Sequence, residues 1–248
     1  MSSIADLFAT EPDIADKVAP LVGFTSPTVA SLVYALSPGS PLGSSFMKNP
    51  DTNTSAAAKD AKEFIKFINE QDIKTKPLQL SSFPFAPPNA AFVPPDSLPG
   101  HPERFITWSH DRLPGAGILA HEYGHAKNYA DLEKKFGKSG TNFLTKYLFA
   151  RHPVMRNIRG LAGLASLITA MKGNKDDVAL GAGLIGSAIG VPQLIEETVA
   201  SARGYNALKK LKLKGKWKAF SGLPTYAAAT LAPLAPWLGK KIYEKSKN

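Results

Sequence analysis

The stretch that most constrains this chain is Ile118-Leu119-Ala120-His121-Glu122-Tyr123-Gly124-His125-Ala126. Its two histidines stand four residues apart, and Glu122 directly follows the first. On an α-helix these positions lie one turn apart on one face, so His121 and His125 can bind the same tetrahedral metal ion. Glu122 then projects beside the ion, where it suits a general base that takes a proton from a water. The pattern predicts a metal-binding helix over residues 115–136.

The residues around the motif favour this interpretation. Small and apolar residues lead into the helix from 115 to 120, as expected of a helix that is buried on its metal side. Gly124 stands between the histidines, at a helical position where glycine is about 1 kcal/mol less favourable than alanine. A glycine there indicates that another backbone, or a substrate, comes close. The alternative is a pair of surface histidines on a solvated helix that binds no metal.

The composition limits which residues can bind a metal and suggests that the protein lies near an anionic partner. The chain has 248 residues, no cysteine and a formal net charge of +10. Without cysteine, disulfides and thiolate sites are excluded, so a zinc site must use His, Asp or Glu. The positive charge favours an anionic neighbour, and both nucleic acid and an anionic membrane surface fit it. The first nine residues do not resemble a secretory signal.

The segments before the motif predict packing elements. Residues 1–50 are low in charge and broken by Pro and Gly, which predicts an irregular N-terminal arm. Residues 56–71 carry an apolar stripe at helical spacing and predict a packing helix. Residues 89–93 and 104–108 predict two short strands. We expect 105–108 to form an edge strand to which an extended peptide adds through main-chain hydrogen bonds, the alternative being an ordinary small sheet over the core.

An apolar helical hairpin is predicted over residues 158–195. Residues 160–171 are apolar and small, a short polar turn follows, and residues 178–195 contain no charge. A helix needs about 20 apolar residues to cross a bilayer. The many Gly, Ala and Ser residues suit close helix packing in lipid. The pattern predicts a hairpin in a membrane, and the alternative is a buried hairpin of a soluble α-domain.

Charges flank the hairpin on both sides. Arg151, Arg156 and Arg159 precede it, and a basic run follows it: Arg203, Lys209, Lys210, Lys212, Lys214, Lys216 and Lys218. The positive-inside rule places both hairpin ends, and with them the metal helix, on the cytoplasmic side of a membrane. A soluble cytoplasmic form is the alternative. A third apolar run over residues 223–238 contains three prolines, and we do not predict that it spans.

A zinc peptidase site needs a third protein ligand besides the two histidines. Glu196 and Glu197 stand where the second apolar segment ends. Two glutamates at that point are unexpected unless they are paired or bind a metal. The alternative is that both belong to the hydrated end of a helix.

At this point the chain resembles a family. His121-Glu122-Tyr123-Gly124-His125, followed later by Glu197-Thr198-Val199-Ala200-Ser201, is similar to the M48-type membrane-associated zinc metallopeptidases, which are gluzincins. Asn89-Ala90-Ala91-Phe92 also resembles a strand that these enzymes carry before the metal helix. The resemblance covers roughly residues 89–208. It is specific at the two motifs and loose between them.

The resemblance implies Zn²⁺ as the cofactor and Glu197, rather than Glu196, as the third ligand. It also implies a peptide or protein substrate. Ser201 stands where the family usually has Asp, a residue that commonly supports a ligand histidine through a hydrogen bond. The chain departs from the family pattern at this supporting residue. Ser201 and Glu196 are the residues that we expect in that supporting position.

These inferences combine into one prediction of fold. We expect an α+β, mostly α chain with a zincin-like helical metallopeptidase core, a small edge sheet and the apolar hairpin. The N-terminal arm covers residues 1–50, the metallopeptidase domain with the hairpin covers 51–222, and an apolar and basic C-terminal segment covers 223–248.

The predicted function is a zinc-dependent endopeptidase at or near a membrane, in which zinc and Glu122 activate water. Tyr205 or Arg203 is the predicted oxyanion donor, and His110 is a substitute candidate. The alternative for Tyr205 and Arg203 is that they lie at a membrane interface. The rival is a non-enzymatic membrane-interaction protein with a structural or vestigial metal site. Membrane lipids are expected partners. We expect no nucleic-acid partner, because Trp217 and Phe220 give the basic run little aromatic interleaving and no known motif.

Overall fold

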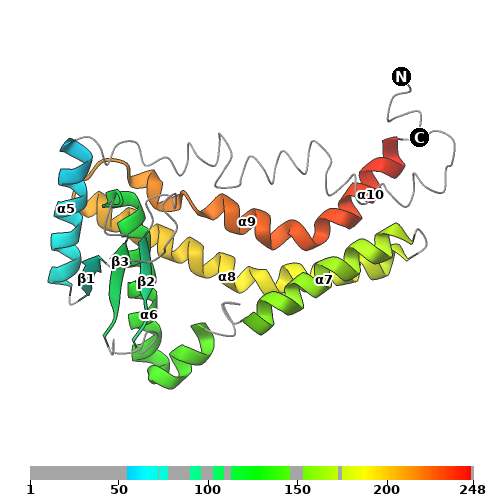
Figure 1. Cartoon of the computed structure of the whole chain (residues 1–248), viewed down its shortest axis with the longest axis horizontal. Helices are drawn as coiled ribbons and strands as arrows, with labels where there is room; N and C mark the ends of the chain where they lie inside the picture. The colour runs from blue at the N-terminus through cyan, green and yellow to red at the C-terminus, as the bar shows by residue number, and fades with distance from the viewer. Residues whose placement is uncertain are drawn as a thin grey trace. The chain divides into compact units, whose positions relative to one another are not determined.

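The computed structural model describes residues 55–71, 73–77, 90–95, 103–108, 113–145, 153–172 and 175–246. The predicted N-terminal arm and His110 lie outside these ranges. The described chain is mostly helical, with one small sheet (Figure 1). This confirms the coarse fold class, α+β and mostly α.

The elements are α5 (Ser55–Glu70), β1 (Lys74–Pro77), β2 (Ala90–Val93), β3 (Phe105–Trp108), α6 (Ala116–Phe143), α7 (Pro153–Met171), α8 (Asp176–Lys210), η2 (Lys216–Phe220), α9 (Leu223–Leu231), η3 (Ala232–Leu234) and α10 (Ala235–Ser246).

The chain divides into two compact units. The first, here called the sheet unit, contains α5, the three strands, α6, the part of α8 from Ile195 onward, and η2. The second, the hairpin unit, contains α7, the part of α8 up to Leu194, α9 after its first residue, η3 and α10. All residues of the predicted metal site lie in the sheet unit.

Helix α6 forms the centre of the sheet unit because one of its faces is apolar. Leu119 and Ala120 are fully buried there, together with Phe64 of α5 and Ile106 of β3. The ring of Tyr123 on α6 meets Phe64 edge-on at 5.9 Å, which fixes α5 against α6. The packing helix that the sequence predicts over 56–71 is therefore present as α5.

The metal helix is longer than predicted. Gly137 has a φ of 69°, in the left-handed region, and interrupts α6 near the predicted end at residue 136. The helix resumes after this break and continues to Phe143, because the Thr141 hydroxyl donates to the Gly137 carbonyl at 2.8 Å and helps to start a new turn.

The sheet has the order β1-β3-β2. Strand β3 pairs in parallel with β1 and antiparallel with β2, and all four of its residues are buried. The prediction that residues 105–108 form an edge strand is therefore wrong: β3 is central, and among the described strands β2 lies at an edge. The sequence did not show the second neighbour because Lys-Thr-Lys-Pro at 74–77 lacks the apolar alternation that indicates a strand.

In the hairpin unit, α7 and the first part of α8 pack antiparallel. Ser166 donates to the carbonyl of Ala179 at 2.8 Å, and a side-chain carbon on Gly186 would stand 3.1 Å from Ala162 Cβ. The predicted hairpin thus forms. The segment after α9 closes over it, since the same carbon on Gly186 would stand 2.7 Å from Pro233 Cβ.

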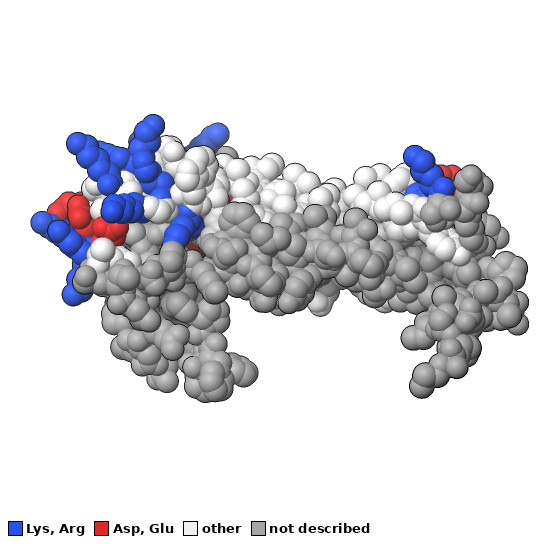
Figure 2. Space-filling view, turned by 90° about the horizontal axis from the view of Figure 1, so that it is seen from above, with Lys and Arg blue, Asp and Glu red and all other residues white. Residues whose placement is uncertain are grey.

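The apolar surface of the hairpin unit is largely exposed. Of the helices in the described ranges, α8 alone is long and apolar enough to cross a membrane, and 28% of its most apolar window is buried. A core helix of a soluble domain would be mostly buried. Figure 2 shows charged side chains of described residues gathered over the sheet unit and near α10, and the other described atoms of the hairpin unit that are visible in this view are uncharged. Large exposed apolar residues of the unit include Val154, Ile158, Leu161, Leu164, Ile168, Val178, Leu184, Ile185 and Val191.

Candidate metal centre

Two glycines let α6 and α8 approach until their backbones touch. A side-chain carbon on Gly124 would stand 1.9 Å from the carbonyl oxygen of Ala200. One on Gly204 would stand 2.4 Å from the carbonyl oxygen of Ala120. Any larger residue at either position would force the helices apart. The close approach of a second backbone, which Gly124 indicated from the sequence, is therefore confirmed.

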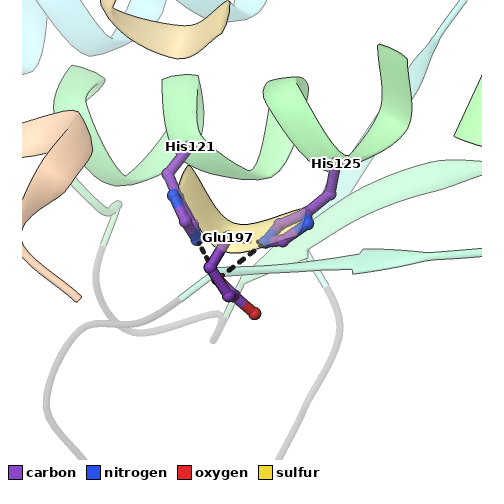
Figure 3. Close-up of side chains that lie close together, drawn as sticks. All are labelled: His121, His125 and Glu197. Carbon is purple, nitrogen blue, oxygen red and sulfur yellow. Dashed lines mark hydrogen bonds and ion pairs between the residues drawn. The ribbon is translucent and has the colours of Figure 1, made fainter. Parts of the chain in front are cut away.

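This crossing brings three ligand atoms together. Figure 3 shows both imidazoles projecting from α6 toward the carboxylate of Glu197, which comes from α8. His121 Nε2 lies 3.1 Å from Glu197 Oε2, His125 Nε2 lies 3.3 Å from the same oxygen, and the two Nε2 atoms are 3.0 Å apart. For metal–ligand bonds of about 2.0–2.1 Å, adjacent ligands of a tetrahedral zinc ion stand about 3.3 Å apart. The triangle therefore matches one face of such a tetrahedron to within a few tenths of an ångström.

The three residues differ in exposure. The side chains of Glu197 and His125 are buried, whereas the His121 side chain is 14% exposed. The small solvent exposure of the three-residue group is therefore mainly at His121. In a catalytic metal site a water or substrate must occupy the fourth position. These three residues can hold a metal ion.

Each histidine is held through its other ring nitrogen. His125 Nδ1 lies 2.6 Å from Glu196 Oε1, and His121 Nδ1 lies 3.1 Å from the hydroxyl of Ser201. Partners of this kind fix the ring orientation and leave Nε2 as the atom that faces the metal. The structure therefore places Glu196 and Ser201 in the supporting positions that the sequence suggested. The serine hydroxyl occupies the position for which the family resemblance implied a carboxylate.

Sequence reasoning missed one member of this network, Asn128. Its amide Nδ2 donates to the carbonyl oxygen of Glu196 at 3.3 Å and to its carboxylate Oε1 at 3.4 Å. Asn128 is buried and lies seven residues after His121, on the same face of α6. A polar side chain in that register on a buried face is the signal that points to it. Asn128 thus restrains Glu196, which in turn holds His125.

The charges of the group are coupled. Burial lowers the pKa of His125, but hydrogen bonds with Glu196 and Glu197 outweigh this effect and raise it to about 10. Burial raises the pKa of Glu197, while hydrogen bonds with His121 and His125 lower it to about 2. Two buried carboxylates therefore hold a proton on His125 at neutral pH in the metal-free protein. A divalent cation can take the place of that proton.

Glu122 points toward the edge strand. Its Oε2 accepts a hydrogen bond of 2.7 Å from the main-chain N–H of Phe92 in β2. Because this N–H is directed at Glu122, it points away from β3, so the outer edge of β2 faces the metal helix. The carboxylate is thereby fixed between the helix that carries both histidines and an edge strand.

The two predicted oxyanion donors contact other residues. Tyr205 packs its ring against Trp217 at 4.9 Å and against Phe220 at 5.9 Å. The Arg203 guanidinium pairs with Asp131 of α6 at 2.5 Å. Within the described chain, neither residue forms a hydrogen bond or ion pair with the three-ligand group. Their role as donors stays a prediction.

Comparison of the chain with protein-family models, with curated proteins and with solved structures gave no match.

Proposed function

We propose that this chain is a zinc-dependent peptidase, with His121, His125 and Glu197 as the metal ligands. The observation that carries the proposal is the triangle of ligand atoms, whose sides of 3.0 to 3.3 Å fit one face of a zinc tetrahedron. Nitrogen and carboxylate ligands suit zinc, and a structural site would instead have four protein ligands. The described residues provide three ligands rather than four, which favours a catalytic site. The sequence resemblance to M48-type metallopeptidases, with their zincin-like core, points the same way.

Glu122 is the general base in this proposal. A zinc ion in the site supplies an acidified water and a Lewis acid for the substrate carbonyl. Glu122 takes the proton of the attacking water and later delivers it to the leaving amine. The Phe92 N–H holds one oxygen of the Glu122 carboxylate, so the other can be directed at the water. Meanwhile Ser201 and Glu196 keep the two imidazoles in their binding orientation.

The substrate is an extended peptide that adds to β2 rather than to β3. Strand β2 is an edge strand, and its outer edge faces Glu122 through Phe92. Main-chain hydrogen bonds to such an edge hold a peptide with little demand on its sequence. In this proposal the scissile carbonyl of the peptide lies beside the helix that carries the motif.

We also propose that the enzyme works at a membrane. The support is the length and apolar composition of α8, of which residues 178–195 would lie in lipid, and the exposed apolar surface of the hairpin unit. The basic residues on both sides of the hairpin favour a cytoplasmic position for its ends. In a soluble form that exposed apolar surface would have to be covered.

The test is a comparison of Glu122→Gln with Glu133→Gln, a glutamate on the same helix outside the motif. Zinc content is measured by elemental mass spectrometry, and cleavage is followed on a dye-labelled unfolded protein. We expect Glu122→Gln to keep one zinc per chain and lose cleavage, and Glu133→Gln to keep both. If Glu122→Gln still cleaves the substrate, Glu122 is not the general base. Zinc binding without any cleavage by the unaltered chain would favour the rival reading, a structural metal site in a membrane-interaction protein.

A further inference from the structure

A pocket of about 490 Å³ lies in the hairpin unit, on the side where α7 faces α9 and η3. From α7 it is lined by Arg159, Gly160, Gly163, Leu164 and Leu167, and from the opposite side by small residues and a proline. Its volume falls within the range of pockets that bind small molecules, about 300–1,000 Å³. Apart from Arg159 the lining is apolar. It therefore suits a hydrocarbon chain.

Arg159 supplies one cationic end of this pocket. It is half-buried, and no acidic side chain in the described ranges forms an ion pair with it. Three helices meet at its guanidinium. A side-chain carbon on Gly190 of α8 would stand 3.2 Å from Arg159 Cζ and 3.0 Å from the hydroxyl of Thr230 of α9. Glycine at 190 thus makes the space that the guanidinium occupies. A half-buried, unpaired arginine in an apolar hairpin is costly unless an anion binds it.

The order of the lining residues along α7 gives the pocket a direction. Arg159 is at one end and Leu167 at the other, eight residues later, which corresponds to about 12 Å along a helix. One leaflet of a bilayer has a hydrocarbon depth of about 15 Å. Arg159 also lies toward the end of the hairpin that carries the other arginines of this segment, where lipid headgroups are expected. A phosphate at Arg159 would leave one acyl chain lying along the pocket.

We propose that this pocket binds one anionic phospholipid, with its phosphate on Arg159 and an acyl chain against Gly160, Gly163 and Leu167. Arginine suits the phosphate because its planar guanidinium can donate two parallel hydrogen bonds. The bound lipid supplies the anion that Arg159 lacks. The inference rests on the proposed membrane association, but it is independent of the proposed peptidase chemistry.

The test uses the full chain in detergent, with native mass spectrometry as the readout. The probes are dioleoyl phosphatidylglycerol and, as the zwitterionic comparison, dioleoyl phosphatidylcholine. Three variants are compared: Arg159→Gln removes the anion contact, Gly160→Leu fills the pocket, and Lys172→Gln removes an exposed charge elsewhere on the hairpin. Gly160→Leu is a tolerable change, because a side-chain carbon at Gly160 meets no atom within 4 Å.

We expect the unaltered chain and Lys172→Gln to retain one phosphatidylglycerol. Arg159→Gln should bind it about 10- to 100-fold more weakly, the range expected for loss of a charge-assisted hydrogen bond. Gly160→Leu should also bind it more weakly, because the new side chain occupies space in the pocket. Equal retention by Arg159→Gln would overturn the proposal. So would displacement of the lipid by inorganic phosphate, which would show a site for the headgroup alone. Displacement by an equal concentration of oleate would also overturn it, in favour of a carboxylate ligand.

Flotation with vesicles of phosphatidylcholine alone separates this inference from the membrane proposal. If the chain fails to float but still retains phosphatidylglycerol through Arg159, membrane association falls and the pocket stands. If the chain floats while all variants retain the lipid equally, the pocket falls and membrane association stands.

Discussion

The contact between α6 and α8 makes Gly124→Ala a severe test of the metal site. Helix propensity alone predicts that this change stabilises the protein by about 1 kcal/mol. The structure predicts the opposite, because the new Cβ would stand 1.9 Å from the carbonyl oxygen of Ala200. Real contacts of this kind are at least 3.0 Å, so the backbone of α8 has to move by 1.1 Å or more.

That movement would reach the metal ligands. Glu197 lies less than one helical turn before Ala200, so its carboxylate would shift with the backbone. Metal–ligand distances tolerate only about 0.2 Å. We therefore expect Gly124→Ala to weaken zinc binding about 10- to 100-fold, as loss of ligand orientation commonly does. Overpacking costs about 1–3 kcal/mol, and the helix gain offsets about 1 kcal/mol, so we expect a net loss of stability of about 0–2 kcal/mol.

Two measurements follow this change. Zinc affinity is determined by competition with a chromogenic chelator, and stability by thermal unfolding in detergent, where each kcal/mol corresponds to about 2–4 °C. Gly181→Ala is the matched control on α8, because a Cβ there meets nothing within 4 Å. It should keep zinc and be neutral or stabilising. If Gly124→Ala behaves like Gly181→Ala in both assays, the backbone contact between the helices does not set the ligand geometry.

Two further predictions concern the residues around the ligands. Asn128→Ala frees the Glu196 carboxylate that holds His125, so zinc affinity should fall about tenfold. The control Lys134→Ala, at an exposed position of α6, should leave it unchanged. Equal affinities in the two variants would remove Asn128 from the network. Zinc binding at pH 7 should release about one proton, because His125 has a pKa of about 10 in the metal-free protein and must lose its proton to bind. Since Glu197 is already ionised with a pKa of about 2, one proton leaves for each zinc bound, and affinity should fall about tenfold for each unit that the pH drops between about 9 and 7. Calorimetry in two buffers of different ionisation enthalpy measures the proton, and a buffer-independent enthalpy would contradict its release.

Local spacing was enough to predict part of the site. His121 and His125 belong to one turn of one helix, so their convergence follows from helical geometry alone. Glu197 lies 76 residues after His121, and no local rule connects them; only the resemblance to a family distinguished it from Glu196. Helical spacing could also have identified Asn128, because it lies on the face of α6 that carries both histidines.

The sheet shows where sequence reasoning fails. The strands at β2 and β3 were predicted from their apolar residues, but the neighbours of a strand are set by pairing with distant segments. Lys74–Pro77 becomes a strand because it pairs with the buried β3, not because of its own composition. This pairing makes β3 central, so of the two predicted strands only β2 stays at an edge of the described sheet. The consequence for function is specific, because β2 is the strand that contacts Glu122.

X-ray absorption at the zinc edge, on the full chain and on Glu197→Gln, tests the central claim most directly. The account predicts one zinc per chain with two imidazoles and further oxygen ligands at about 2.0–2.2 Å in the unaltered protein. It predicts that Glu197→Gln loses most of the metal or shows a changed ligand shell. A chain that takes up no zinc, or a Glu197→Gln variant with full zinc and an unaltered spectrum, would contradict it.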